Sequence, residues 1–207
     1  MIKSLCKSLI NKPITITMTI NNISIQISNC NAFGDNFEEL LYIVLQEKLS
    51  SFIKGKPQKS PDFYYNDIEY ELKTFTKFPC FDIAEPNCYI DELLQKNGVK
   101  RKLFNKNYLI FEYEVKDNIY YIKNFWHKKI WDLFGYNGKY PLTCQNKRNG
   151  FQKFRPCTSS KWKNKTADQF IKHLIQFIKE CPIIIDKTSK INNINLQWIK
   201  LQKQREV

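Results

Sequence analysis

The chain has 207 residues, of which 43% are hydrophobic, 14% aromatic and 26% charged. That much apolar material can form a packed core and excludes general disorder. The sequence contains no run of about 18 apolar residues, so we expect no membrane span. The N-terminal stretch lacks the long apolar region and the cleavage site of a secretory signal, which predicts a cytoplasmic protein.

Charge is the first feature that bears on function. Lys and Arg number 33 against 20 Asp and Glu, which gives a formal net charge of +13. A protein this basic typically binds polyanions, of which nucleic acid is the commonest. The alternative is a basic protein whose charge only keeps it in solution.

An alternating segment and an amphipathic segment open the chain. Isoleucine, methionine and threonine alternate on both sides of Asn21-Asn22. This predicts a β-hairpin over 13–28, because asparagine accepts the left-handed conformation of tight turns. One face of this hairpin is apolar and packs on the core or on a partner subunit. Further along, an apolar stripe with Asp35 as N-cap and Glu38 three residues later predicts a helix over 35–53.

Two further hairpins are expected in the middle of the chain. Residues 62–75 form two short strands around Asn66-Asp67, and the second of these alternates strictly between apolar and charged residues. Residues 108–115 and 119–122 form the other pair of strands. Helices are predicted over 88–96, 125–134, 167–180 and 191–204.

The second strand of the 62–75 hairpin carries an unusual set of charges. Glu69, Glu71 and Lys73 share one face, because residues i and i+2 of a strand point the same way. Leu72 anchors the strand from behind, and Asp62 on the neighbouring strand can lie beside Glu71. Two adjacent carboxylates suit Mg²⁺, and a lysine beside them can hold an attacking water and attract a phosphate. The competing interpretation is the solvated face of an edge strand.

The spacing Pro61-Asp62, eight residues, Glu71-Leu72-Lys73 resembles the PD-(D/E)xK nuclease superfamily. The resemblance implies that Asp62 and Glu71 bind a metal ion, with Leu72 counted among the ligands. It also implies that Lys73 contacts the water and the scissile phosphate.

A second Glu-x-Lys, Glu114-Val115-Lys116, shows how easily the bare pattern arises. No Pro-Asp precedes it, and it runs directly into a turn. The first copy, by contrast, has the hairpin, the spacing and a strand with a dry back face.

Two more residues resemble the subgroup that contains the mismatch-repair nickase MutH and small restriction endonucleases. In that subgroup a glutamate on the helix before the motif completes the metal site, and Glu47 borders the apolar stripe of the predicted helix. Without such a site, Glu47 is a plain surface residue. A second lysine just before the next strand is also used, a role that falls on Lys102, with Lys100 and Arg101 as alternatives. The implied catalytic residues are Asp62, Glu71, Lys73 and Lys102, and the implied metal ligands are Asp62, Glu71, Leu72 and Glu47.

Positive charge is concentrated between Leu133 and Ala167. This stretch has no acidic residue in the sequence and supplies +8 of the net +13. Lysines attract phosphates whatever the base sequence, whereas Arg, Asn and Gln can read base edges. The segment is therefore the best candidate for DNA recognition; the alternative is a solvated basic loop. The predicted DNA-binding residues are Lys147, Arg148, Lys153, Arg155, Lys161, Lys163 and Lys165.

The resemblance implies one restriction-endonuclease-like domain of the α/β (α+β) class, with a central mixed β-sheet flanked by helices. The expected parts are an N-terminal hairpin (13–28), a catalytic core (about 35–125), a basic segment (about 133–167) and C-terminal helices (167–205), all within one nuclease domain over 1–207.

The implied activity is that of a type II restriction endonuclease with Mg²⁺ as cofactor. It would cut double-stranded DNA to leave a 5′-phosphate and a 3′-hydroxyl. It would act as a homodimer, because a palindromic site matches a two-fold axis, and alongside a DNA methyltransferase. The alternatives are a MutH-like nickase or repair nuclease, and a non-catalytic basic module that binds DNA or RNA.

Overall fold

The hairpins expected from alternation are present in the structure. The computed structural model describes residues 1–20, 23–26, 30–56, 61–94, 106–135, 140–146, 152–162 and 166–203. Strand β5 (Phe63–Tyr65) pairs antiparallel with β6 (Ile68–Phe75), and the turn residues Asn66 and Asp67 have φ angles of 49° and 61°. Both values lie in the left-handed region, which Asn and Asp accept more readily than most residues. The predicted turn chemistry therefore sets this hairpin.

The described chain divides into two compact units, which we describe separately. The first consists of Met1–Pro79 with Lys106–Lys128, and the second of Cys80–Asn105 with Lys129–Val207. The elements of the first unit are α1 (Ile2–Lys7), β1 (Pro13–Ile14), β2 (Thr17–Ile20), β3 (Ile23–Gln26), α2 (Cys30–Gln46), β4 (Phe52–Lys54), β5, β6, β7 (Asn107–Lys116) and β8 (Ile119–Lys129).

A mixed six-stranded sheet forms the frame of the first unit, in the order β1-β8-β7-β6-β5-β4. Strands β6 and β7 run parallel, with Glu71 opposite Tyr108, whereas the pairs β4–β5, β5–β6 and β1–β8 are antiparallel. Strands β2 and β3 form a separate two-stranded sheet, which confirms the N-terminal hairpin for Thr17–Gln26, whereas Pro13–Ile14 of the predicted range 13–28 pairs instead with β8. This mixed sheet with helices packed on it is the predicted architecture.

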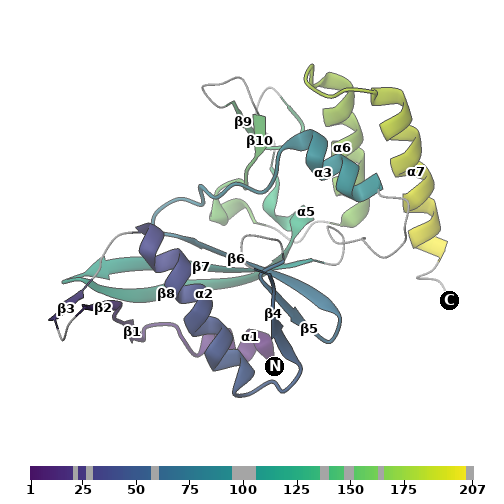
Figure 1. The fold of residues 1–207 in the computed structure, drawn as a ribbon. Coiled ribbons are helices and arrows are strands. Elements are labelled where there is room, and N and C mark those ends of the chain that lie inside the picture. The colour runs from purple at the N-terminus through teal and green to yellow at the C-terminus, as the bar shows by residue number, and fades with distance from the viewer. Residues whose placement is uncertain are drawn as a thin grey trace. The chain divides into compact units, whose positions relative to one another are not determined.

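Helix α2 lies across the sheet (Figure 1) and supplies much of the core. Phe33 and Phe37 are buried, and the ring centroid of Phe37 is 4.9 Å from that of Phe111 on β7. Burying side chains of this size contributes about 1.5–3 kcal/mol each. The helix begins at Cys30 rather than at the predicted Asp35, because its apolar stripe already starts at Phe33. Its last residue is Gln46, and the predicted C-terminal part instead leads into β4.

The predicted helix over 125–134 is wrong for most of its length. Strand β8 continues to Lys129, and only Ile130–Leu133 is helical. Aromatic contacts across the sheet hold this stretch extended: Phe125 lies 4.8 Å from Phe111, and Trp126 lies 5.7 Å from Phe75, measured between ring centroids. Such cross-strand pairs stabilise a strand against the local helical pattern.

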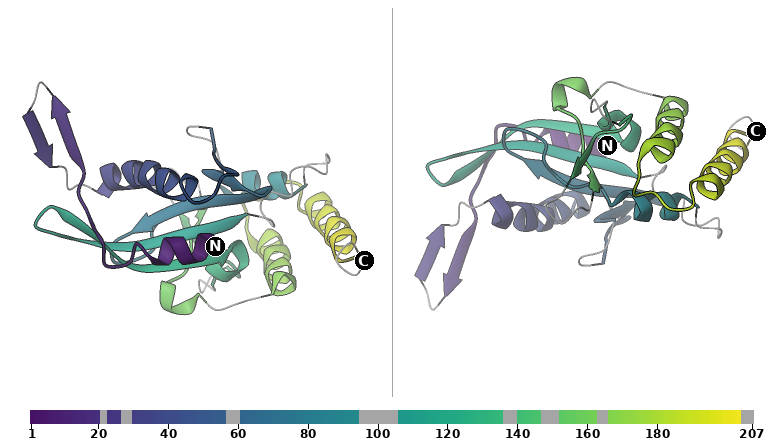
Figure 2. Two further views of the ribbon diagram at one scale, coloured as in Figure 1. Left: turned by 90° about the horizontal axis from the view of Figure 1, so that it is seen from below. Right: turned by 90° about the horizontal axis from the view of Figure 1, so that it is seen from above.

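The second unit is largely helical. Its elements are α3 (Pro86–Leu94), α5 (Ile130–Leu133), β9 (Cys144–Asn146), β10 (Gln152–Phe154), the short 3-10 helix η1 (Ser159–Lys161), α6 (Ala167–Glu180) and α7 (Lys187–Lys203). Figure 2 shows α6 and α7 side by side. Helix α6 has the predicted bounds, with Thr166 accepting a hydrogen bond from the Gln169 amide at its start. Helix α7 begins before the predicted residue 191. No helix among the described residues is long and apolar enough to cross a bilayer.

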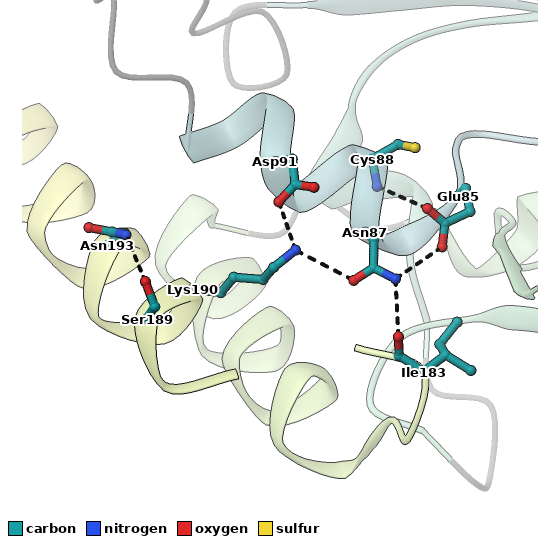
Figure 3. A network of polar contacts seen from close by, with 8 residues as sticks. All are labelled: Glu85, Asn87, Cys88, Asp91, Ile183, Ser189, Lys190 and Asn193. Atoms are coloured by element: carbon teal, nitrogen blue, oxygen red, sulfur yellow. Dashed lines mark hydrogen bonds and ion pairs between the residues drawn. The ribbon is translucent and has the colours of Figure 1, made fainter. Parts of the chain in front are cut away.

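A polar network ties α3 to α7 in the second unit (Figure 3). Lys190 is only 7% exposed, and its Nζ lies 2.7 Å from Asp91 Oδ1 and 3.4 Å from Asn87 Oδ1. Asn87 Nδ2 in turn donates to the carbonyl of Ile183 at 3.1 Å. These bonds satisfy a buried ammonium group, which would otherwise be costly to remove from water.

Candidate active site

The β5–β6 hairpin brings the predicted motif residues together. Tyr70 and Leu72 point into the core with 5% and 6% exposure, so the intervening Glu71 and the following Lys73 occupy the opposite face of β6. Asp62 precedes β5, and its Oδ2 accepts a 2.6 Å hydrogen bond from the Leu72 amide. The alternating pattern thus places two carboxylates and one ammonium group at the same end of the hairpin.

The Asp62 carboxyl is strongly affected by its surroundings. Burial and then the negative charge of Glu71 raise its pKa from 3.8 to about 6, against the lowering effects of Lys73 and of the Leu72 amide. Both leading causes disfavour the charged form. A cation bound beside Asp62 and Glu71 would relieve both. Perturbed carboxylates of this kind are typical of functional sites, although structural clusters also produce them.

Glu71 lies between two lysines. Its Oε1 is 2.8 Å from Lys73 Nζ, and its Oε2 is 3.3 Å from Lys106 Nζ. Burial by itself lowers the pKa of Lys73, but the carboxylates of Glu71, Asp62 and Glu38 outweigh it and the net pKa is raised. Lys73 is therefore a cation at neutral pH.

Lys106 is a member of this cluster that the sequence reasoning missed. The predicted second lysine, Lys102, and the alternatives Lys100 and Arg101 lie outside the described residues. Lys106 directly precedes β7, and the parallel register, which pairs Tyr70 with Asn107, places it at the level of Glu69. Its long side chain reaches along the same face of β6 to Glu71 Oε2 at 3.3 Å. The predicted strand start at residue 108 was the available signal, since the role requires a lysine just before that strand.

The helix glutamate that approaches this cluster is Glu38, not Glu47. Glu47 is exposed and follows the last residue of α2. Glu38 interacts electrostatically with both Asp62 and Lys73, and burial followed by neighbouring acidic residues raises its pKa against the effect of Lys54 and Lys73. The two positions are nine residues apart, or about two and a half helical turns, and therefore lie on opposite sides of a helix. In the sequence, Glu38 was interpreted as part of the helix cap, so it was not predicted as a member of the site.

The second Glu-x-Lys lies at the end of β7. Glu114 Oε1 is 2.7 Å from Lys116 Nζ, and the Lys116 side chain is 64% exposed. Glu114 also pairs with Lys123 at 3.6 Å. The charged residues of this second copy therefore lie beside a turn, where the lysine is exposed to solvent.

The chemistry of the donors fits a hard divalent cation that keeps several waters. Among the described residues, no three His, Cys, Asp or Glu side chains gather closely enough to hold a metal ion. Asp62 and Glu71 are in electrostatic contact, and the main-chain carbonyl of Leu72 stands between the motif residues. Mg²⁺ is usually held in this way, by one or two carboxylates with waters and substrate phosphate completing its shell.

The basic segment of the second unit is partly described. Lys147, Arg148, Lys163 and Lys165 lie outside the described residues. Lys153 Nζ and Arg155 Nη2 each lie 2.9 Å from a carboxylate oxygen of Asp82, and Lys161 is exposed on η1.

Strand β10 holds this basic pair on a buried support. Phe154 is fully buried between Lys153 and Arg155 in sequence, and its ring contacts those of Phe134 and Phe177 at 5.2 Å and 4.9 Å. The two cations therefore project from the other face of the strand.

The proteins that this chain resembles are restriction endonucleases. The family model described as "NgoBV restriction endonuclease" matches residues 2–204. The type II restriction enzyme NlaIV from Neisseria lactamica is 28% identical over an alignment of 150 positions that covers 68% of this chain and 60% of that enzyme. The solved structure of NlaIV restriction endonuclease matches with a TM-score of 0.74 and 22% identity, over 94% of this chain and 85% of that chain. This structural likeness shows a shared fold.

Proposed function

Because the chain belongs to the NgoBV restriction endonuclease family, we propose that it hydrolyses double-stranded DNA at specific sites with the help of Mg²⁺. The observation that carries this proposal is the half-buried group of Asp62, Glu71 and Lys73 on one hairpin, in a chain of net charge +13. We propose a 5′-phosphate and a 3′-hydroxyl as the products, a homodimer as the active form, and a DNA methyltransferase as its functional partner.

The chain's own residues would divide the work as follows. Asp62, Glu71 and the Leu72 carbonyl would hold Mg²⁺, which supplies Lewis-acid stabilisation of the charge that develops on the phosphate. Lys73 is cationic, so it cannot accept a proton; it would hold the attacking water by its oxygen and attract the scissile phosphate. Lys106, whose Nζ lies 3.3 Å from Glu71 Oε2, would add a buried positive charge that attracts the scissile phosphate.

Cleavage of a plasmid tests this proposal. We expect discrete fragments with Mg²⁺, none with EDTA, and none with Asp62→Ala in Mg²⁺. Nicked circles alone would indicate a nickase of the MutH type. A mobility shift without any cut in Mg²⁺, at several pH values, would contradict an enzymatic role and favour a binding module.

Recognition is proposed for the basic segment of the second unit. Lys161→Ala should weaken binding to all duplexes and reduce the salt slope by about one unit, because a phosphate contact releases one counterion. Arg155→Ala should cost about 1–3 kcal/mol mainly on the cognate site, because a guanidinium can form two parallel hydrogen bonds to a guanine. Binding is measured across a salt series in Ca²⁺, with the exposed Lys172→Ala on α6 as the matched control. If all three variants bind like the wild type, the segment is a solvated loop.

A further inference from the structure

Gly55 lies directly beside the residue that opens the candidate active site. The β4–β5 register pairs Lys54 with Phe63, so its continuation places Gly55 opposite Asp62. The Gly55 amide donates a 2.6 Å hydrogen bond to the Asp62 carbonyl oxygen. Asp62 is therefore held at two points, by Gly55 through its main chain and by the Leu72 amide through its carboxylate.

The space at Gly55 excludes any side chain. A Cβ atom added there would lie 2.9 Å from the Asp62 carbonyl oxygen, and still closer to the carbonyl oxygen of Pro61. Both are main-chain atoms, which cannot rotate away as the end of a side chain can. The φ angle of Gly55 is outside the left-handed region, so the requirement is for space and not for an unusual backbone conformation.

We propose that Gly55 is a positioning residue: its missing side chain lets β4 approach Pro61-Asp62 and thereby aims the Asp62 carboxylate at the metal site. The inference rests on the proposed function and adds to it. Any residue larger than glycine must shift the main chain at Pro61 or Asp62. Because the 2.6 Å hydrogen bond from the Leu72 amide holds the Asp62 carboxylate by one oxygen, that shift moves the carboxylate relative to Glu71. Residues that orient metal ligands typically change metal affinity by about 10–100-fold when they are replaced.

The first test compares Gly55→Ala with Gly34→Ala. Gly34 is a matched control in the same unit, because a Cβ there meets only Thr74 Oγ1 at 3.7 Å, an ordinary contact. Mn²⁺ binding without DNA, followed by electron paramagnetic resonance, should weaken about tenfold or more in Gly55→Ala and stay unchanged in Gly34→Ala. Cleavage by Gly55→Ala should recover in part at high Mg²⁺. Wild-type Mn²⁺ affinity in a folded Gly55→Ala would overturn the proposal.

A double variant separates positioning from general damage. In an Asp62→Ala background, Gly55→Ala should cause no further loss of Mn²⁺ affinity, because its effect passes through Asp62. An equal further loss would overturn the proposal. If Asp62→Ala itself leaves metal binding and cleavage intact, the proposed function is wrong. If Asp62→Ala abolishes both while Gly55→Ala matches the wild type, only the role of Gly55 is wrong.

A measurement on the wild-type protein covers the case in which Gly55→Ala does not fold. The ¹⁵N-labelled Gly55 amide should shift with Mg²⁺ concentration at the same midpoint as the Asp62 carboxyl, because the Gly55 amide donates the 2.6 Å hydrogen bond to the Asp62 carbonyl. A Gly55 amide that does not respond while Asp62 does would overturn the proposal.

Discussion

The two Glu-x-Lys sequences lie on the neighbouring parallel strands β6 and β7 and form nearly the same local contacts. On β6, Glu71 and Lys73 are 2.8 Å apart; at the end of β7, Glu114 and Lys116 are 2.7 Å apart. Each glutamate also meets a second lysine, at 3.3 Å and 3.6 Å respectively. The local pattern of an acid with two cations therefore does not by itself make a site.

Burial and a second carboxylate separate the two copies. The Lys106 side chain beside Glu71 is 6% exposed, whereas that of Lys123 beside Glu114 is 47% exposed. Asp62 adds a negative charge near Glu71, and its pKa is raised by burial and by that neighbour. At Glu114, by contrast, hydrogen bonding to Lys116 lowers the pKa of the carboxyl. At the first copy, a bound cation would relieve the repulsion between the carboxylates of Glu71 and Asp62. At the second copy, Lys116 and Lys123 already neutralise the charge of Glu114.

The largest expected effect is the loss of Glu71. Glu71→Ala should reduce cleavage on the order of 10³-fold or more, since it removes a proposed metal ligand from a reaction that is very slow without catalysis. Glu114→Ala should cleave at the wild-type rate. Single-turnover rates on a plasmid at saturating enzyme and Mg²⁺ provide the comparison. The reverse result would assign the site to the β7 copy.

The two accompanying lysines give the next largest difference. Lys106→Met should lower the rate at saturating Mg²⁺ by about tenfold or more, because a buried cation near the developing phosphate charge is lost. It should not raise the Mg²⁺ concentration needed for cleavage, because Lys106 pairs with an oxygen of Glu71 and is not itself a metal ligand. The matched variant Lys123→Met should change neither quantity. An increased Mg²⁺ requirement in Lys106→Met would contradict this assignment.

The pH dependence of stability should differ in sign between the two copies. The pKa of Asp62 is raised to about 6 in the folded protein, so the unfolded chain loses this proton first. The stabilisation is complete below about pH 4 and is lost as the pH rises through about 6. Asp62→Asn should remove a decline of about 1–2 kcal/mol in the free energy of unfolding over this interval, after allowance for partial solvent access.

The control for this measurement is Glu114→Gln. The pKa of Glu114 is lowered, so its small contribution is present above the unfolded pKa and is lost as the pH falls. Urea midpoints between pH 4 and pH 7 for both variants and the wild type test the two signs. A midpoint for Asp62→Asn that varies with pH like the wild type would show that Asp62 is not the group that titrates.

The smallest effect is expected on helix α2. Glu38→Gln should raise the Mg²⁺ concentration for half-maximal cleavage several-fold, because a negative charge in electrostatic contact with Asp62 and Lys73 is removed. Glu47→Gln, an exposed position just after the end of α2, should leave that concentration unchanged. Thermal unfolding of both variants checks that the helix is intact. Equal behaviour of the two would remove Glu38 from the site.

The local part of the site was predictable from the sequence. Alternation in 68–75 and the turn at Asn66-Asp67 determine which side chains share a face, and neither depends on distant residues. Helix α6 was predicted with its bounds for the same reason, because its cap and its stripe lie within one segment.

Contacts between distant segments were not predictable. Lys106 joins the site through the parallel pairing of β6 and β7, which no local pattern specifies. The pattern in 125–134 predicts a helix, but contacts with the rings of Phe111 and Phe75 on other strands hold its first part extended. Glu47 seemed suitable because the helix was expected to extend to residue 53; with its end at Gln46, that position falls outside the helix.

The sequence separation between β6 and β7 affects how the protein folds during synthesis. Strand β6 has β5 as a neighbour as soon as the hairpin is synthesised, but its other neighbour, β7, follows only after Cys80–Asn105, which belongs to the second unit. A nascent chain that has not yet emerged beyond Lys116 leaves that edge of β6 open, and open edges are prone to pairing with other chains. It also lacks Lys106, which pairs with the second oxygen of Glu71 in the folded protein. Fragments that stop at Pro79 should therefore aggregate, and the sheet around β6 can be completed only after β7 has been synthesised.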